Sequence, residues 1–229
     1  MLLDIVDEVG HQKALEYIDK YFGTQENGRP NYTGSHFETF ADGGDAPGRE
    51  HMINADDLLA VSCLAVYVPA QASIGLLGPS AEPVGRLLAQ LPADRALGEL
   101  SNTEYEELLG PTSPGQNLWD LLRQNNDGTR WKVGETTASK ILARKRPHLF
   151  PIIDSVVRGR TGLKNDDIWR TWHQELQATD GDDSPLVRAL TEIHADCGQP
   201  HLSLLRVLDI VLWMDGTQEG KSAPRESVD

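Results

Sequence analysis

Residues 130–164 read RWKVGETTASKILARKRPHLFPIIDSVVRGRTGLK, and the prediction of the fold starts from this stretch. Val133–Gly134 forms a turn before a short basic helix, because glycine tolerates backbone conformations that other residues resist. Pro147 ends that helix. Pro151 keeps the residue before it extended, so that a rigid apolar segment delivers Asp154 to the start of the next helix.

The stretch is basic inside an acidic chain. It holds nine Lys and Arg residues against two acids, a net charge of +7, whereas the rest of the chain holds 12 basic and 33 acidic residues, a net charge of −21. Such contrast indicates contact with an anion, or with something else that differs from the remaining surface. The total charge of −14 works against nucleic-acid and anionic-membrane partners, so any nucleic-acid contact must come from this local patch.

Length, cysteines and hydropathy limit the class of protein. The 229 residues suffice for a sizeable core. Cys63 and Cys197 form no CxxC pair and no disulfide framework, which favours a reduced, cytoplasmic setting. The first residues, MLLDIVDEV, carry acids where a signal peptide carries bases. The most apolar run, residues 58–72, is too short to span a bilayer, so we expect no membrane partner.

Helical periodicity predicts an all-α fold, with at most a minor strand pair near residues 31–40. An amphipathic helix is predicted over residues 4–22, and Asn54 is predicted to cap a buried helix that runs to residue 68. Asp56 and Asp57 would occupy its first turn, where acids favour the helix dipole, and we prefer this interpretation to metal ligation. The remaining predicted helices cover residues 83–91, 103–109, 117–123, 168–176, 186–197 and 201–214.

One spacing suits zinc. His194, Cys197 and His201 give HxxCxxxH, and their residue types are those of zinc ligands. Gly198 and Pro200 interrupt the helix between them, and a fourth ligand is not evident. We therefore interpret Cys197 as a buried cysteine and predict neither a metal nor another cofactor.

The start of the basic helix is a predicted phosphate site, because its first N–H groups have no partner within the helix. Thr136, Lys140 and Arg144 lie at i, i+4 and i+8, on one face of the helix. The predicted anion contacts are Gly134, Thr136, Thr137, Lys140, Arg144, Lys145, Arg146 and Arg158. Solvent exposure of the charged residues among them is the alternative that we keep open.

The stretch resembles the helix-hairpin-helix DNA glycosylase superfamily, which includes the adenine glycosylases and endonuclease III. Val133-Gly134 and Thr137-Ala138 match the family hairpin Gly-Val-Gly-x-x-Thr-Ala, which binds a DNA phosphate. Phe150-Pro151-Ile152-Ile153-Asp154 resembles the Phe-Pro-Ile-Leu-Asp of adenine glycosylases, and Asp154 follows Thr136 with the family spacing of 18 positions. The sequence LARKRPHLFPIIDSVV also resembles a divergent group of bacterial proteins of no assigned function.

This resemblance implies a single helical domain over residues 1–214, with the helix-hairpin-helix and catalytic segment at 117–164 and a polar, flexible tail at 215–229. It implies a DNA glycosylase in which Asp154 stabilises the positively charged sugar and assists an attacking water as a flipped base leaves. Thr136 stands where strand-cleaving members have lysine, so no Schiff base forms and the enzyme would be monofunctional. Lys132 departs from the pattern by replacing the first hairpin glycine.

The rival hypothesis is a non-catalytic protein that kept the scaffold and in which residues 130–164 bind an acidic partner, the protein's own acidic surface or nucleic acid. Asp154 would then serve only as a helix cap. A cleft with Asp154 exposed at its base favours the enzyme, whereas an Asp154 buried in hydrogen bonds to a helix start, with no cleft, favours the binder. Trp131, Tyr32 and Phe37 are the candidate aromatic residues for a base pocket.

Overall fold

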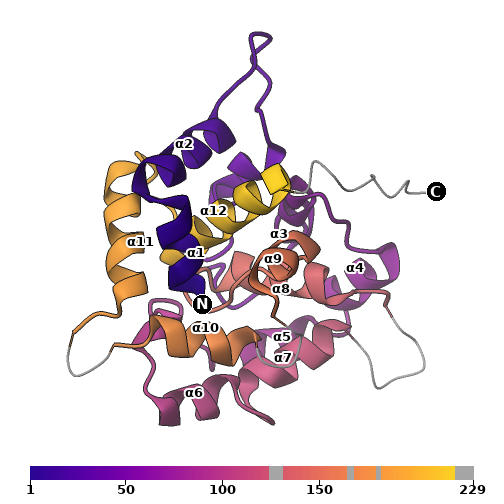
Figure 1. Ribbon diagram of the computed structural model, residues 1–229. Helices are drawn as coiled ribbons and strands as arrows, with labels where there is room; N and C mark the ends of the chain where they lie inside the picture. Colours follow the sequence, from indigo (N-terminus) through magenta and orange to yellow (C-terminus); the bar gives the residue numbers. More distant parts are fainter. Residues whose placement is uncertain (124–130, 164–167, 179–181, 220–229) are drawn as a thin grey trace.

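The computed structural model describes residues 1–123, 131–163, 168–178 and 182–219 (Figure 1). These residues form an all-α fold, as predicted. The α-helices are α1 (Leu2–Val9), α2 (His11–Phe22), α3 (Ala55–Ala60), α4 (Ala70–Leu77), α5 (Ala81–Leu88), α6 (Asn102–Leu109), α7 (Pro114–Arg123), α8 (Glu135–Lys145), α9 (Ser155–Thr161), α10 (Ile168–Leu176), α11 (Pro185–Asp196) and α12 (Leu204–Glu219). The short 3₁₀ helices are η1 (Thr33–His36), η2 (Phe40–Asp42), η3 (Val61–Leu64) and η4 (Leu97–Glu99).

The helices form two groups. The N-terminal and C-terminal helices make up the first group, and helices from the middle of the chain make up the second. Helices α1, α2 and α11 pack around α12, so both ends of the described chain belong to one group (Figure 1). Helices α5, α6 and α7 form the other group, which α8 joins through its contact with α7. Helix α9 packs on α12, and α8 contacts α3 and η3. Helix α8 therefore belongs with the second group through α7, whereas α9 belongs with the first group through α12.

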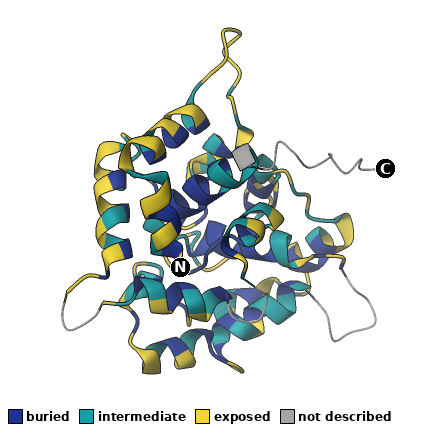
Figure 2. Cartoon of the chain, in the orientation of Figure 1, coloured by how far each residue is buried: buried dark blue, intermediate teal, exposed yellow. Residues whose placement is uncertain are grey.

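One hydrophobic core joins the two groups. Helix α12 is its centre, because apolar residues surround it almost completely and leave little surface for water (Figure 2). Its fully buried residues are Val207, Leu208, Ile210, Val211, Leu212 and Met214. Among the described helices, none combines the length and the apolar character that a membrane crossing requires.

Two predicted helices are interrupted at residues with positive φ. The helix expected over residues 4–22 breaks at Gly10, whose φ of 78° separates α1 from α2. The helix expected from Asn54 to residue 68 ends early, because α3 passes into η3 and Ala65 takes the left-handed φ of 58°. Asn54 does cap α3, in a capping box with Asp57. Periodicity alone did not show these breaks, since apolar residues continue across both of them.

The strand pair considered near residues 31–40 is not formed there. This segment carries η1, and η2 follows it, while an isolated antiparallel bridge joins Thr24 to Pro30 at the base of the projecting loop in Figure 1. The carbonyl groups of Phe37, Glu38 and Phe40 accept hydrogen bonds from Arg144 instead of from a second strand. A side chain of α8 thus replaces strand pairing in this loop.

The domain boundary expected at residue 214 is too early, because α12 continues to Glu219. Asp215 accepts hydrogen bonds from the Tyr17 hydroxyl at 3.1 Å and from Arg160 Nε at 2.6 Å, which tie it to α2 and α9. Gly216 lies against Val156 of α9, where a Cβ would meet the valine at 2.8 Å. Residues 220–229 of the predicted tail lie outside the described part of the chain.

Candidate active site

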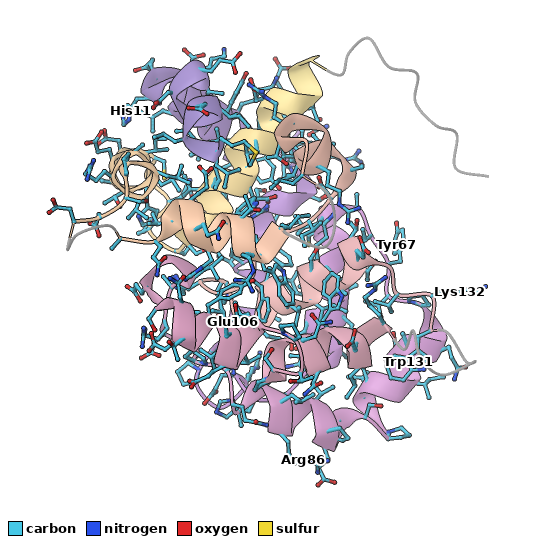
Figure 3. The ribbon with its side chains drawn as sticks, turned by 60° about the horizontal axis from the view of Figure 1, so that its bottom comes forward. His11, Tyr67, Arg86, Glu106, Trp131 and Lys132 are labelled. Carbon is cyan, nitrogen blue, oxygen red and sulfur yellow. The ribbon has the colours of Figure 1, made fainter. Side chains whose placement is uncertain are left out.

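The turn before α8 contains a left-handed residue, at Lys132. Its φ is 58°, whereas Gly134 has an extended backbone with φ −79°. We predicted that Gly134 would use the freedom of glycine, and this was wrong: the unusual conformation falls at Lys132, the position of the first glycine in the resembled hairpin. The left-handed region costs a residue with a Cβ about 1 kcal/mol. Figure 3 shows Lys132 projecting away from the molecule.

Helix α8 begins without a side-chain cap, because the residue at its cap position is Gly134. Gly134 is exposed and nothing lies within 4 Å of the Cβ that another residue would add. The N–H groups of the first turn have no partner within the helix. Thr136 and Thr137 are half-buried in this turn. This helix start therefore has the open donors that the predicted phosphate site needs.

The apolar segment before Asp154 is rigidly held. Pro151, Ile152 and Ile153 are buried, and Ile153 exchanges two hydrogen bonds with the Ser139 hydroxyl on α8. Its N–H donates to Ser139 Oγ at 3.0 Å, and the hydroxyl proton is shared between the carbonyl oxygens of Thr136 at 3.0 Å and Ile153 at 3.3 Å. Asp154 is thereby fixed relative to α8, as the sequence predicted.

Asp154 caps α9 with one of its two carboxylate oxygens. Oδ1 accepts hydrogen bonds from the N–H groups of Val156 at 3.0 Å and Val157 at 2.9 Å. Oδ2 makes no hydrogen bond to any described residue, and the side chain is half-buried. The cap holds the carboxylate in one orientation and leaves the second oxygen for other chemistry.

Asp154 also lines a cavity of about 390 Å³ between α2, α8, α9 and α12, which we call the Asp154 cavity. Asp154 thus lines a cleft, the feature that favours the enzyme, and it also forms the helix cap that the rival hypothesis assigns to it. Its polar lining residues include Thr136, Lys140, Arg206 and Asp209. This volume lies at the lower end of the range of about 300–1,000 Å³ that is typical of ligand pockets, so the cavity suits a small group of about the size of a nucleobase.

Three aromatic residues form one wall of the Asp154 cavity. Tyr32 stacks on Tyr21 with ring centroids 5.3 Å apart and an angle of 7° between the rings. Trp213 meets Tyr32 edge-on, with centroids 5.5 Å apart. Of the three candidate aromatic residues, only Tyr32 lines this cavity. Phe37 lines a separate cavity of about 370 Å³, and Trp131 packs against Gly75 of α4.

Lys140 belongs to the interior of this cavity rather than to a phosphate-binding surface. The residue is 5% exposed, and its Nζ donates a hydrogen bond to the Leu64 carbonyl at 2.9 Å. Burial lowers the pKa of Lys140, and the nearby charge of Asp154 opposes that shift. Lys140 on α8 and Asp154 at the start of α9 thus line the same cavity. The sequence predicted the two elements but not that these side chains share a cavity.

The buried charges of α12 complete the site. Arg206 donates hydrogen bonds to Glu38 at 2.6 Å, to the Tyr21 hydroxyl at 2.9 Å and to Asp209. Burial raises the pKa of Asp209 to about 6, although the charge of Arg206 acts in the opposite direction. We did not predict Arg206, Asp209 or Trp213 as site residues. Two charges three positions apart inside the apolar sequence LSLLRVLDIVLWM were the available signal.

Three predicted anion contacts are corrected, because Arg144, Lys145 and Arg146 point into the protein. Their exposed fractions are 3%, 0% and 0%. Arg144 donates to Asp57 Oδ1 at 3.3 Å, and Lys145 donates to Asp57 Oδ2 at 3.0 Å. Two cations therefore share one buried carboxylate, and neither is available to a phosphate.

The same three cations hold the irregular segment 37–50 by its backbone carbonyls. Arg144 donates to the carbonyls of Phe37 and Glu38, Lys145 to those of residues 44 and 49, and Arg146 to that of residue 50. Arg146 also donates to the carbonyls of residues 88 and 91, at the end of α5 and just after it. A loop without regular structure has many unpaired carbonyl groups, and burying them requires donors. The cation run of α8 supplies these donors inside the molecule.

Arg158 forms an ion pair with Glu135 at 2.5 Å, and the same carboxylate meets Arg123 at 3.5 Å. The pair joins the first turn of α8 to α9. Arg158 is half-buried and does not line the Asp154 cavity. Its predicted anion contact would require this pair to open.

The HxxCxxxH residues do not converge on a metal site. The Cys197 thiol is hydrogen-bonded to the His194 carbonyl at 3.3 Å, and His201 packs edge-on against Phe22. The described residues contain no group of three or more His, Cys, Asp or Glu side chains that could hold a metal ion. The zinc alternative therefore has no geometric support in this part of the chain.

The fold and the cavity define an all-α protein with a positioned carboxylate between two helix groups. Residues 14–216 match the model of a family of unknown function, DUF6308, and the chain belongs to this family. Comparisons with curated proteins and with solved structures found no match.

Proposed function

We propose that the protein hydrolyses the N-glycosidic bond of a damaged or modified base in DNA or a related nucleic acid, with Asp154 as the catalytic carboxylate. The observation that carries this proposal is the second oxygen of Asp154. It makes no hydrogen bond to a described residue, although the first oxygen is held by two N–H groups at the edge of a cavity with an aromatic wall.

The chemistry follows from the charge and position of this carboxylate. As the base leaves, positive charge develops on the sugar, and a fixed negative charge nearby stabilises it. The free oxygen can accept a proton from the water that attacks the sugar. Tyr32 and Trp213 offer ring surfaces on which a planar base can stack. Thr136 lines the cavity and has no amino group at the position where strand-cleaving members of the resembled family have lysine. The amine that does line the cavity, Lys140 Nζ, donates its hydrogen bond to the Leu64 carbonyl.

The first turn of α8 is the proposed phosphate contact. Gly134, Thr136 and Thr137 place N–H groups at a helix start next to the cavity. Lys132, which is exposed, adds a positive charge before this turn. The proposed contact rests on backbone donors, because the cations in the last turn of α8 are used inside the protein.

The rival proposal of a non-catalytic binding protein receives support from the helix cap that Asp154 forms. That cap gives the residue a purely structural task. The rival also requires an exposed basic surface on residues 130–164, and Arg144, Lys145 and Arg146 do not provide one. We therefore favour the enzyme.

The test uses Asp154→Asn, because asparagine caps helices as well as aspartate does but lacks the negative charge. Wild type and variant are incubated with single- and double-stranded DNA that carries assorted damaged bases, and free base and abasic sites are measured. Asp196→Asn is the matched control, since this exposed carboxylate pairs with His11 on the surface. We expect base release by wild type and control and a loss of about 100-fold or more in Asp154→Asn. Equal rates in all three proteins, or no release by any, would reject the proposal.

A further inference from the structure

Asp209 is a buried carboxylate with an incomplete set of hydrogen bonds. It is 3% exposed and lines the Asp154 cavity from α12. One oxygen accepts a hydrogen bond from Arg206, whereas Oδ1 is buried and has no hydrogen-bond partner in the described structure. A buried polar atom without a partner is costly, and it calls for either a proton or a ligand. Asp209 therefore lines the cavity with a buried oxygen whose hydrogen bonding is incomplete.

Charged groups on several elements face Asp209. Asp154, at the start of α9, raises its pKa, while Arg206 on α12 and Lys140 on α8 lower it. Burial raises the pKa of Tyr21 on α2, and the nearby charge of Asp209 adds to that rise while Arg206 opposes it. Burial is the largest influence, and it brings the pKa of Asp209 to about 6. The second carboxylate of the cavity can thus carry a proton in a pH range in which an ordinary carboxylate has lost it.

We propose that Asp209 is the proton donor to the leaving base, opposite in role to Asp154. This inference rests on the proposed function. The bond between the sugar carbon and the base nitrogen breaks, and a ring nitrogen of the base takes the proton of Asp209. The oxygen of water bonds to the sugar carbon, and Asp154 takes the proton of that water. Solvent then removes the proton from Asp154 and returns one to Asp209, so that one water is consumed.

Two carboxylates with different tasks explain why the cavity keeps both. A leaving base needs a proton donor, and an attacking water needs a proton acceptor. The surroundings of the two side chains differ: Asp154 accepts hydrogen bonds from two N–H groups, whereas Asp209 lies in the core with one oxygen unpaired. Lys140 and Arg206 line the same cavity and offset the negative charge there.

The test compares a neutral purine base with 7-methylguanine, which is already cationic and leaves without a proton donor. Both are placed in otherwise identical oligonucleotides, and base release is measured between pH 5 and 8. For wild type we expect the ratio of neutral-base to 7-methylguanine release to fall about tenfold for each pH unit above 6. Asp209→Asn should lower neutral-base release about 100-fold and leave 7-methylguanine release within about threefold of wild type. Asp154→Asn should lower both.

The results separate failure of this inference from failure of the proposed function. If wild type releases both bases and their ratio does not change with pH, Asp209 is not the proton donor, and this conclusion needs no variant. Equal losses of both bases in Asp209→Asn would also reject the donor role, in favour of a structural one. If wild type releases neither base, the proposed function fails and the role of Asp209 fails with it.

Discussion

Asp154 has two tasks, helix capping and the proposed chemistry, and two substitutions separate them. Asp154→Ala removes the acceptor for the Val156 and Val157 N–H groups and should lower the free energy of unfolding by about 1 kcal/mol. Asp154→Asn keeps an acceptor, so its free energy of unfolding should stay within about 0.5 kcal/mol of wild type. Urea denaturation measures both. Equal stabilities of the alanine and asparagine variants would show that the cap contributes nothing.

Lys132 gives a second prediction at this scale, because its left-handed backbone is strained by the side chain. Lys132→Gly should have a higher free energy of unfolding than Lys132→Ala, by about 1 kcal/mol. The alanine variant is the control, since it removes the charge and keeps the strain. Thermal or urea denaturation of the two variants measures this difference in the free energy of unfolding. A glycine variant no more stable than the alanine variant would contradict a left-handed backbone at Lys132.

Single residues differed in how far the sequence revealed them. The position of Asp154 at a helix start could be predicted, because local signals fix it: a proline, an apolar segment and a side chain that caps helices well. Asp209 could not be placed in the same cavity, because its position depends on how α12 packs against α8 and α9. That packing joins residues far apart in the chain, and hydrophobic periodicity predicts single helices but not which distant helices pack together.

Among the elements, α8 shows why the predicted anion contacts of the basic stretch were wrong for Arg144, Lys145 and Arg146. Its charge contrast with the rest of the chain was real, and an anion was the simple partner to infer from it. The partners are instead the carboxylate of Asp57 and the carbonyls of segment 37–50, both about 90 residues or more before the cations that bind them. A sequence shows an excess of donors, but it does not show which acceptors a fold brings to them.

The arrangement of α3 and α8 makes Asp57 the counterion of two buried cations. Asp57→Ala would leave Arg144 and Lys145 without it and should lower the free energy of unfolding by about 3–5 kcal/mol. Asp56→Ala is the matched control, because Asp56 lies in the same first turn but is exposed, and we expect a loss of under 1 kcal/mol. Chemical denaturation of both variants provides the comparison. Similar losses in the two would contradict the buried ion pairs.

At the scale of the whole molecule, the all-α class followed from helical periodicity and is confirmed. The grouping of the helices was out of reach, because it requires the two ends of the chain to pack together around α12. The N-terminal amino group even contacts Glu175, on α10, at 3.0 Å. Contacts between residues so far apart in the chain leave no signal in the local sequence. The cavity that these contacts form could therefore not be predicted and was found only in the structure.

The charge distribution predicts how DNA binding responds to salt. With a net charge of −14 and three cations of α8 inside the core, few Lys or Arg side chains remain for phosphate contacts near the cavity. We expect a plot of log Kobs against log salt concentration to have a shallow slope, about −1 to −2 for duplex DNA. Fluorescence anisotropy between 20 and 200 mM salt measures it. A slope of about −5 or steeper would reveal a basic surface that this account lacks.

The central claim is that Asp154 performs hydrolysis of an N-glycosidic bond in the cavity between α8, α9 and α12. The most direct measurement is the rate of base release from damaged DNA by wild type and by Asp154→Asn, with unchanged thermal stability of the variant as the control for folding. We expect release by wild type and a rate at least about 100-fold lower for the variant. A variant that releases base as fast as wild type, or a wild type that releases none, would contradict it.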